Sequence, residues 1–288
     1  MLKPHAAAIG AGLVALAGFA GCSSLRLAAA GPLIRDVTTA SSKHPDVDLV
    51  TAAAPAFLLL LEGLLEGSPD NPGLLVAAAQ SYTMYGALVE LEDPERARLL
   101  YARGRDFGQR ALARRKGVGP LLQAPYSRFA HITDRLEDED LPAVFWAASS
   151  WGAWIASSPG SMAALAQLPR VVLLMEWVLA RDESYYYASP HVFLGVYHAA
   201  VPPALGGDPE SSRQHFERAR ELSEGKSLMV NVQMARFYAR QIFDRDLYEV
   251  LLRQVLAAPA DAVPELVLQN RVAQQMARQL LGEADANF

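Results

Sequence analysis

Three tryptophans and one serine, close together in the chain, have the chemistry of a wall of an apolar ligand pocket. Trp146, Ser150, Trp151 and Trp154 lie in a stretch from Leu141 to Pro169 that has no charged residue. On a helix they fall within one sector of about 140°. Indole rings supply apolar surface and a serine hydroxyl supplies a polar anchor, as ligand pockets require. Plain core packing uses the same residue types and is the commoner outcome, so both interpretations are open.

Three consecutive tyrosines pose the same choice. Tyr185, Tyr186 and Tyr187 stand near the start of a predicted helix. Successive residues of a helix point in different directions, so the three rings cannot all face one core. At least one of them is expected to face solvent, a ligand pocket or a partner chain.

Catalytic, metal and cofactor chemistry have no support in the sequence. The chain carries no nucleophile elbow, P-loop, His-Glu-x-x-His or paired-cysteine motif, which argues against an enzyme and against a bound cofactor. His191 and His198 share a helix face, but neither has a carboxylate four residues later, so no metal site is expected. Twenty-six basic against 31 acidic residues, with a net charge of -5, also argue against nucleic acid as a partner.

The only cysteine of the chain is expected to carry a lipid. Cys22 follows a tip with one definite positive charge, an apolar run from Ala6 to Ala20, and Gly21. This pattern is typical of a secretory signal, and the apolar run is short for a membrane-spanning helix. Small residues directly before the cysteine resemble a bacterial lipobox, in which the cysteine receives diacylglycerol. We therefore expect a signal peptide over 1–21 and a lipidated tether over 22–45, and Ser23 after the cysteine favours the outer membrane.

The rest of the chain, 46–288, is expected to fold as one all-α domain. Apolar residues recur at spacings of three and four, and no stretch alternates as a strand would. Proline and glycine clusters separate about ten helices of ten to twenty residues. These clusters are Ser68 to Pro72, Gly117 to Pro120, Ser158 to Gly160, Gly206 to Pro209 and Pro259 to Pro264. The most hydrophobic helix, over 144–156, is too short to span a membrane and is expected at the centre of the fold.

Two segments 115 residues apart share one helix-start pattern. The sequence Asp-Pro-Glu-x-x-Arg occurs at 93–98 and again at 208–213, and each copy has an aromatic residue eight positions after the Asp. Asp suits the N-cap and Pro the first turn, where its missing N–H costs nothing. The second copy also has the small, aromatic, small order of the second helix of a tetratricopeptide (TPR) repeat. We expect degenerate TPR-like repeats in a superhelical bundle; the alternative is an irregular bundle with two similarly capped helices.

The order of several short blocks resembles one known family. After Cys22 come Gly31-Pro32-Leu33-Ile34-Arg35-Asp36-Val37, a segment from Ala54 to Leu65, then Ser68 to Pro72, Gly207 to Glu210 and His215 to Ala219. This order resembles the TatT family, the T component of TPR-protein-associated TRAP transporters.

The resemblance implies a periplasmic lipoprotein, anchored to the membrane through its N-terminal lipid and assembled as a homotrimer. Its implied partners are a TRAP substrate-binding protein and a small organic ligand, hydrophobic molecules included. The alternative function is a non-enzymatic TPR scaffold lipoprotein for cell-envelope assembly.

Overall fold

The fold is known from a computed structural model that describes residues 31–288. The predicted signal peptide, Cys22 and most of the tether lie outside the described residues. Within 31–288 the chain forms α-helices, short 3-10 helices and one π-helical turn, and no strand. The all-α prediction is therefore confirmed.

Most of the structure consists of helices of 12 to 21 residues. They are α2 (Val47–Gly67), α3 (Pro72–Val89), α4 (Pro94–Ala113), α7 (Leu141–Ala156), α9 (Leu168–Leu179), α10 (Tyr185–Ala200), α11 (Pro209–Leu222), α13 (Arg245–Ala257) and α14 (Val267–Gly282). A further helix over 31–42 precedes them. Shorter elements connect them: α5 (Gly119–Leu122), α6 (Tyr126–Phe129), η1 (Ala130–Arg135), η2 (Asp138–Asp140), α8 (Met162–Leu165), η3 (Pro203–Leu205), α12 (Met229–Gln233), the π-helical η4 (Met234–Ala239), η5 (Pro264–Leu266) and α15 (Ala284–Asn287).

The predicted helix starts are confirmed at the level of single hydrogen bonds. The Asp93 carboxylate accepts from the backbone N–H of Arg96 at 3.0 Å, and the Asp208 carboxylate accepts from that of Glu210 at 3.0 Å. The next residue in each case is the proline that opens α4 or α11. Asn71 caps α3 in the same way, 2.9 Å from the N–H of Leu74.

The two Asp-Pro-Glu helices also pack alike on the long helix that precedes each. Tyr101 of α4 is buried against Gly86 of α3, and Phe216 of α11 is buried against Gly195 of α10. A methyl group on either glycine would come within 3.0 Å of the aromatic ring. The two copies of the pattern are thus two similar helix pairs. A TPR-like superhelix of more repeats stays a prediction.

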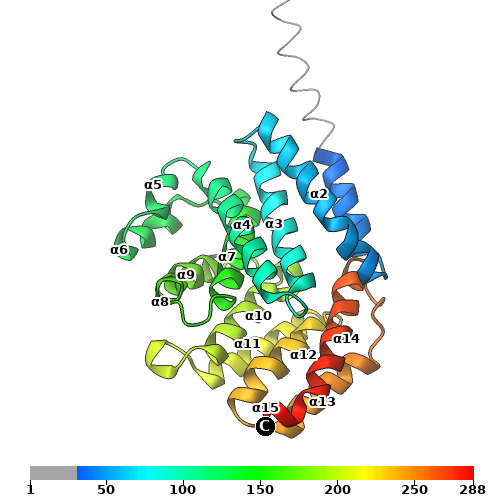
Figure 1. The fold of residues 1–288 in the computed structure, drawn as a ribbon. Helices are drawn as coiled ribbons and strands as arrows, with labels where there is room; N and C mark the ends of the chain where they lie inside the picture. Colours follow the sequence, from blue (N-terminus) through cyan, green and yellow to red (C-terminus); the bar gives the residue numbers. More distant parts are fainter. Residues whose placement is uncertain (1–30) are drawn as a thin grey trace, which may run out of the picture.

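The chain runs from α2 and α3 at the top of Figure 1 to α11–α13 at the bottom, and then turns back so that α14 begins beside α2. One hydrophobic cluster is built from the helices up to α9, and a second from α11 to α15; both extend into α10. An ion pair connects the elements of the two clusters: Arg236 of η4 lies 3.3 Å from the Glu90 carboxylate, directly after α3. The same carboxylate accepts a hydrogen bond from the Tyr101 hydroxyl at 2.7 Å. Near the C-terminus, α14 contacts α2, so an early and a late helix of the described chain lie together.

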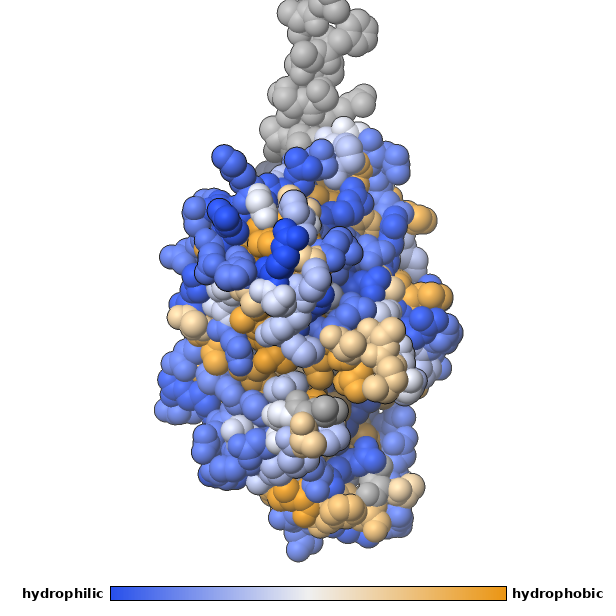
Figure 2. All heavy atoms as spheres, turned by 90° about the vertical axis from the view of Figure 1, so that its left-hand side faces the viewer, coloured by the Kyte–Doolittle hydropathy of each residue, from blue (hydrophilic) through white to orange (hydrophobic). Residues whose placement is uncertain are grey.

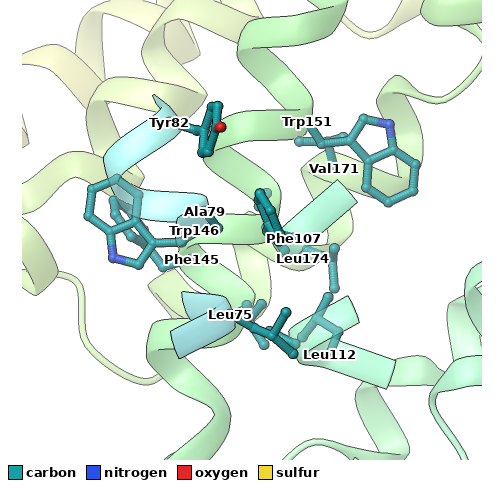
Figure 3. Packing of buried hydrophobic residues seen from close by; sticks show 14 of the residues in the cluster. Leu75, Ala79, Tyr82, Phe107, Leu112, Phe145, Trp146, Trp151, Val171 and Leu174 are labelled. Atoms are coloured by element: carbon teal, nitrogen blue, oxygen red, sulfur yellow. The ribbon is translucent and has the colours of Figure 1, made fainter. Parts of the chain in front are cut away.

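The apolar helix expected over 144–156 is confirmed as α7, which has 16 residues and begins at Leu141, three residues earlier. It packs on α3, α4 and α9. Gly108 of α4 allows the close approach, since a methyl group there would lie 2.6 Å from the Cα of Ala147. Figure 3 shows how side chains from these helices fill the space around α7.

Two segments of the described chain are long and apolar enough to cross a membrane by length and composition alone. They are Val47–Gly67, which is α2, and Met162–Leu179, which covers α8 and α9. The core helix of a soluble protein passes the same test, and both segments contribute buried residues to the core. Only 17% of the apolar stretch within α2 is buried, however, so much of the apolar surface of this helix is exposed.

Candidate functional site

The tryptophans of α7 lie in two different environments. Trp146 is 6% exposed and meets the ring of Tyr186 edge-on, with 5.0 Å between the ring centroids. Trp151 is 2% exposed, meets Phe129 edge-on, and donates from its indole N–H to Gln167 at 2.8 Å. Figure 3 shows the two indoles on opposite sides of the buried cluster. They occupy the two edges of the predicted sector and do not face a common space.

Ser150 and Trp154 have partners within the chain. The Ser150 hydroxyl is fully buried and donates back to the carbonyl oxygens of Trp146, at 2.8 Å, and of Ala147, at 3.1 Å. Trp154 is partly buried, and the guanidinium of Arg105 covers its ring at 4.1 Å from the centroid. A hydroxyl that is bonded within its own helix is a poor anchor for a ligand.

The three tyrosines begin α10 in an unusual backbone conformation. Tyr186, Tyr187 and Ala188 have φ values of 46°, 59° and 62°, which is the left-handed region. Such a conformation costs roughly 1–2 kcal/mol per residue, so the surrounding packing must hold it. Each of the three tyrosines is partly exposed, and whether one of them faces a ligand pocket or a partner chain stays a prediction. The left-handed turn changes the direction of successive side chains, and all three become partly buried.

The tyrosine rings close an aromatic cluster with α7. Phe145 lies 5.1 Å from Tyr185 and 5.5 Å from Tyr186, measured between ring centroids. Burial raises the pKa of Tyr186 to about 12, so its hydroxyl stays protonated. That hydroxyl contacts the sulfur of Met84 in α3 at 3.9 Å. Met84 therefore connects the aromatic cluster to the helices at the start of the fold.

A hollow that the sequence did not predict lies on the other side of Met84. It has a volume of about 310 Å³ and is bounded by the helix over 31–42, by α2 and α3, and by one residue of α14. Its walls include Val37, Ala53, Phe57 and Met84, and none of its lining residues is Asp, Glu, Lys or Arg. Small residues on facing helices leave this space open. The hollow could have been predicted only by knowing which helices pack against each other.

None of the seven predicted ligand-lining residues belongs to this hollow. Trp146, Tyr185 and Tyr186 meet in the aromatic cluster, Tyr187 packs beside Tyr186, and Trp151 and Trp154 lie apart from it. Their role in lining a channel stays a prediction.

Three histidines also meet between α10 and α11. The Nδ1 atoms of His191 and His215 are 2.9 Å apart, and the rings of His198 and His215 stack with centroids 5.7 Å apart. Glu183 lies 3.3 Å from His191, and Arg218 holds the pKa of this carboxyl down at about 2. Among residues 31–288, no group of three or more His, Cys, Asp or Glu residues is arranged to hold a metal ion.

The comparison with protein families decides the identity. A family model for TatT, described as the TRAP transporter T-component, matches residues 43–288. The chain belongs to the TatT family. A comparison with curated proteins found no match.

Family membership makes the chain an accessory component of a TRAP transport system, and T components are not a class of enzyme. The family match covers all the long helices from α2 to α14 and therefore includes the aromatic cluster. It begins after the helix over 31–42. One wall of the apolar hollow thus lies outside the part of the chain that matches the family.

Proposed function

We propose that this TatT chain is a periplasmic lipoprotein that docks a TRAP substrate-binding protein and passes a small organic ligand towards the permease. Membership of the T-component family, over residues 43–288, carries the proposal. An apolar hollow at one end of the helical bundle supports a role in ligand handling. The T-component family is not a class of enzyme, so the proposal assigns the chain a role in transport and no reaction.

The anchor in this proposal is diacylglycerol on Cys22, in the outer membrane. Residues 22–30 would then connect the lipid to the helix over 31–42. Nine extended residues span about 30 Å, so the bundle would stay close to the membrane surface. Mass spectrometry of the mature N-terminus tests this directly, since a lipidated cysteine adds the mass of its acyl chains.

Self-association as a homotrimer is part of the same proposal. The outer face of α2 carries Ala56, Leu59 and Leu60, and the two leucines are 70% and 50% exposed. Exposed apolar residues that recur along one helix face mark surfaces that pack on another protein. We propose that α2 contributes this face to the contact between copies.

A second apolar surface is a candidate for docking the binding protein. Met162 and Leu165 of α8 are 75% and 37% exposed, and Tyr126 of α6 is 46% exposed. Figure 2 shows apolar side chains gathered near the middle of the face that these short helices build.

The alternative is a scaffold lipoprotein that binds peptide segments of envelope proteins. Purifying the tagged chain together with its TRAP substrate-binding protein, followed by mass spectrometry of bound small molecules, separates the two. The transport role requires a stable or ligand-dependent complex with the binding protein. Recovery of envelope assembly proteins without the binding protein would favour the scaffold.

A further inference from the structure

The apolar hollow beside α2 has the composition of a binding site for an uncharged molecule. Its walls are mainly aliphatic and aromatic, from Val37 and Phe57 to Met84 and Leu268. The polar side chains among them include Ser41, His44 and Ser81, which are neutral or able to be neutral. A carboxylate or phosphate placed here would lose its hydration without gaining a lysine or arginine partner, and this is strongly unfavourable.

The size of the hollow limits what it can hold. A volume of about 310 Å³ is near the lower end of the range for small-molecule sites, roughly 300–1,000 Å³. A chain of about ten carbons or a pair of aromatic rings fits this range, whereas a long lipid would extend out of it. Ser41, His44 and Ser81 offer enough hydrogen bonds for one or two polar atoms of a ligand.

The helix over 31–42 forms a loosely packed wall of the hollow. Ile34 is its only buried residue, at 6% exposure. A second hollow of about 390 Å³, which involves Ile34 and Thr38, lies between the same helix and the start of α3. At its end an ion pair of 2.9 Å between Lys43 and Glu265 fastens the chain to η5. A helix held by one buried side chain and one terminal ion pair is suited to move aside when a ligand enters.

We infer that the hollow between the helix over 31–42, α2 and α3 binds a neutral, largely apolar organic molecule. This inference rests on the proposed function and names the ligand class and its place in the chain. The ligand contacts Phe57 and Met84 with its apolar part, and the helix over 31–42 covers it. Met84 also touches the Tyr186 hydroxyl, so an occupied hollow adjoins the aromatic cluster of α7 and α10.

The test uses the mature chain, residues 22–288, with Cys22→Ser, which keeps every residue that the structure describes. The probe is N-phenyl-1-naphthylamine, an uncharged molecule that fluoresces when it enters an apolar site. We expect saturable binding of one probe per chain. Decanol should displace the probe at a concentration about tenfold lower than decanoate, because the lining has no cation for the carboxylate.

Matched substitutions locate the site. Ala53 lines the hollow and Ala52 does not, although both are exposed residues in α2. Ala53→Phe places a ring in the cavity and should raise the Kd of the probe about tenfold or more, whereas Ala52→Phe should leave it within about twofold. Ala40→Phe, on the opposite wall, is a second blocking variant in case Ala53→Phe does not fold, which circular dichroism would show.

Three results would overturn the inference. They are the absence of saturable binding, an equal effect of Ala53→Phe and Ala52→Phe, and loss of binding in Trp154→Ala with normal binding in Ala53→Phe. The outcome is independent of the co-purification experiment. A chain that binds the probe but no binding protein refutes the transport role alone, and the converse result refutes the ligand site alone.

Discussion

At the residue scale, the hydrogen bonds that begin the helices were predictable because they are local. Asp93 and Asp208 each stand directly before a proline, and each carboxylate accepts a backbone N–H two or three residues later. The bond satisfies a donor that the first turn of a helix leaves without a partner. A pattern of three consecutive residues therefore specifies both the start of α4 and the start of α11.

Replacing the Asp93 side chain tests this contribution. Asp93→Ala removes the acceptor 3.0 Å from the Arg96 N–H and should lower the free energy of unfolding by about 1 kcal/mol. Asp93→Asn keeps an acceptor oxygen and should stay within a few tenths of a kcal/mol of the natural chain. Urea denaturation measures both. Equal loss in the two variants would mean that the charge, and not the cap bond, stabilises the helix start.

The histidine cluster makes a pH-dependent contribution at the same scale. Burial lowers the pKa of His191, and burial together with the neighbouring histidines lowers that of His215 to about 4. Two protonated rings would also point N–H groups at each other across the 2.9 Å contact between their Nδ1 atoms. The Glu183 carboxylate partly offsets the lowering of the His191 pKa, and the Arg218 guanidinium lowers that pKa further.

The expected result is a loss of stability in acid. Below about pH 6.5 the histidines of the unfolded chain bind protons, whereas His215 in the folded chain stays neutral until its own pKa of about 4. The free energy of unfolding therefore decreases as the pH is lowered from about 6.5, and it levels off below about pH 4. His215→Gln removes this titration and should flatten the dependence of Tm on pH between these values. His131→Gln is the control, since that ring is 72% exposed. An unchanged slope in His215→Gln would assign the acid sensitivity to other groups.

At the element scale, glycines set how closely the helices pair. Gly86 lets Tyr101 lie against α3, and Gly195 lets Phe216 lie against α10. The aromatic residue of each pair could be identified from the sequence, because it is part of the repeated pattern. The glycine could not be identified, because the number of residues between the glycine and the aromatic residue differs between the two pairs.

Glycine substitutions in two helices should have opposite effects. Gly86→Ala would place a methyl group 2.5 Å from the Tyr101 ring and should destabilise the fold by roughly 1–3 kcal/mol. Gly63→Ala meets nothing within 4 Å in the interior of α2 and should stabilise the chain by roughly 0.5–1 kcal/mol, because alanine favours a helix over glycine. Thermal and urea denaturation of the two variants give the comparison. Similar destabilisation by both would show that close approach at Gly86 is not the cause.

The start of α10 is an element that sequence patterns could not describe. Tyr186, Tyr187 and Ala188 adopt left-handed backbone angles, although none of them is glycine. Contacts with Phe145, Trp146 and Met84 hold Tyr186 there, and these residues come from two other helices. Local preference for a right-handed helix is overridden by packing between distant segments.

At the scale of the whole molecule, α2 is the helix whose apolar surface exceeds what the single chain buries. Leu58, Leu61 and Leu65 face the core, while Leu59 and Leu60 face outward. A helix that is apolar on both sides needs a second contact surface. The proposed trimer would supply that surface for α2.

Introducing a charge on this face should weaken the assembly. Leu59→Glu places a carboxylate where the natural side chain is 70% exposed, so the isolated chain should fold as before. If α2 forms the contact between copies, burying the new charge without a partner is unfavourable, and the trimer should dissociate at micromolar concentration. Sedimentation velocity measures the change. Leu99→Glu, at a leucine that is 58% exposed on α4, is the matched control. Dissociation of the control as well, or of neither variant, would place the interface elsewhere.

The sequence by itself determined the all-α class, the capped starts of α3, α4 and α11, the central apolar helix and the resemblance to the TatT family. These features depend on residues within about four positions of one another, or on short blocks in a fixed order. The tertiary structure alone decided which faces meet. It placed Trp146 against Tyr186 and Trp151 against Phe129, brought His191 next to His215, and left a hollow between α2, α3 and the helix over 31–42. Such arrangements arise from side chains on separate helices packing to a common density, and no periodicity within one helix records its partner.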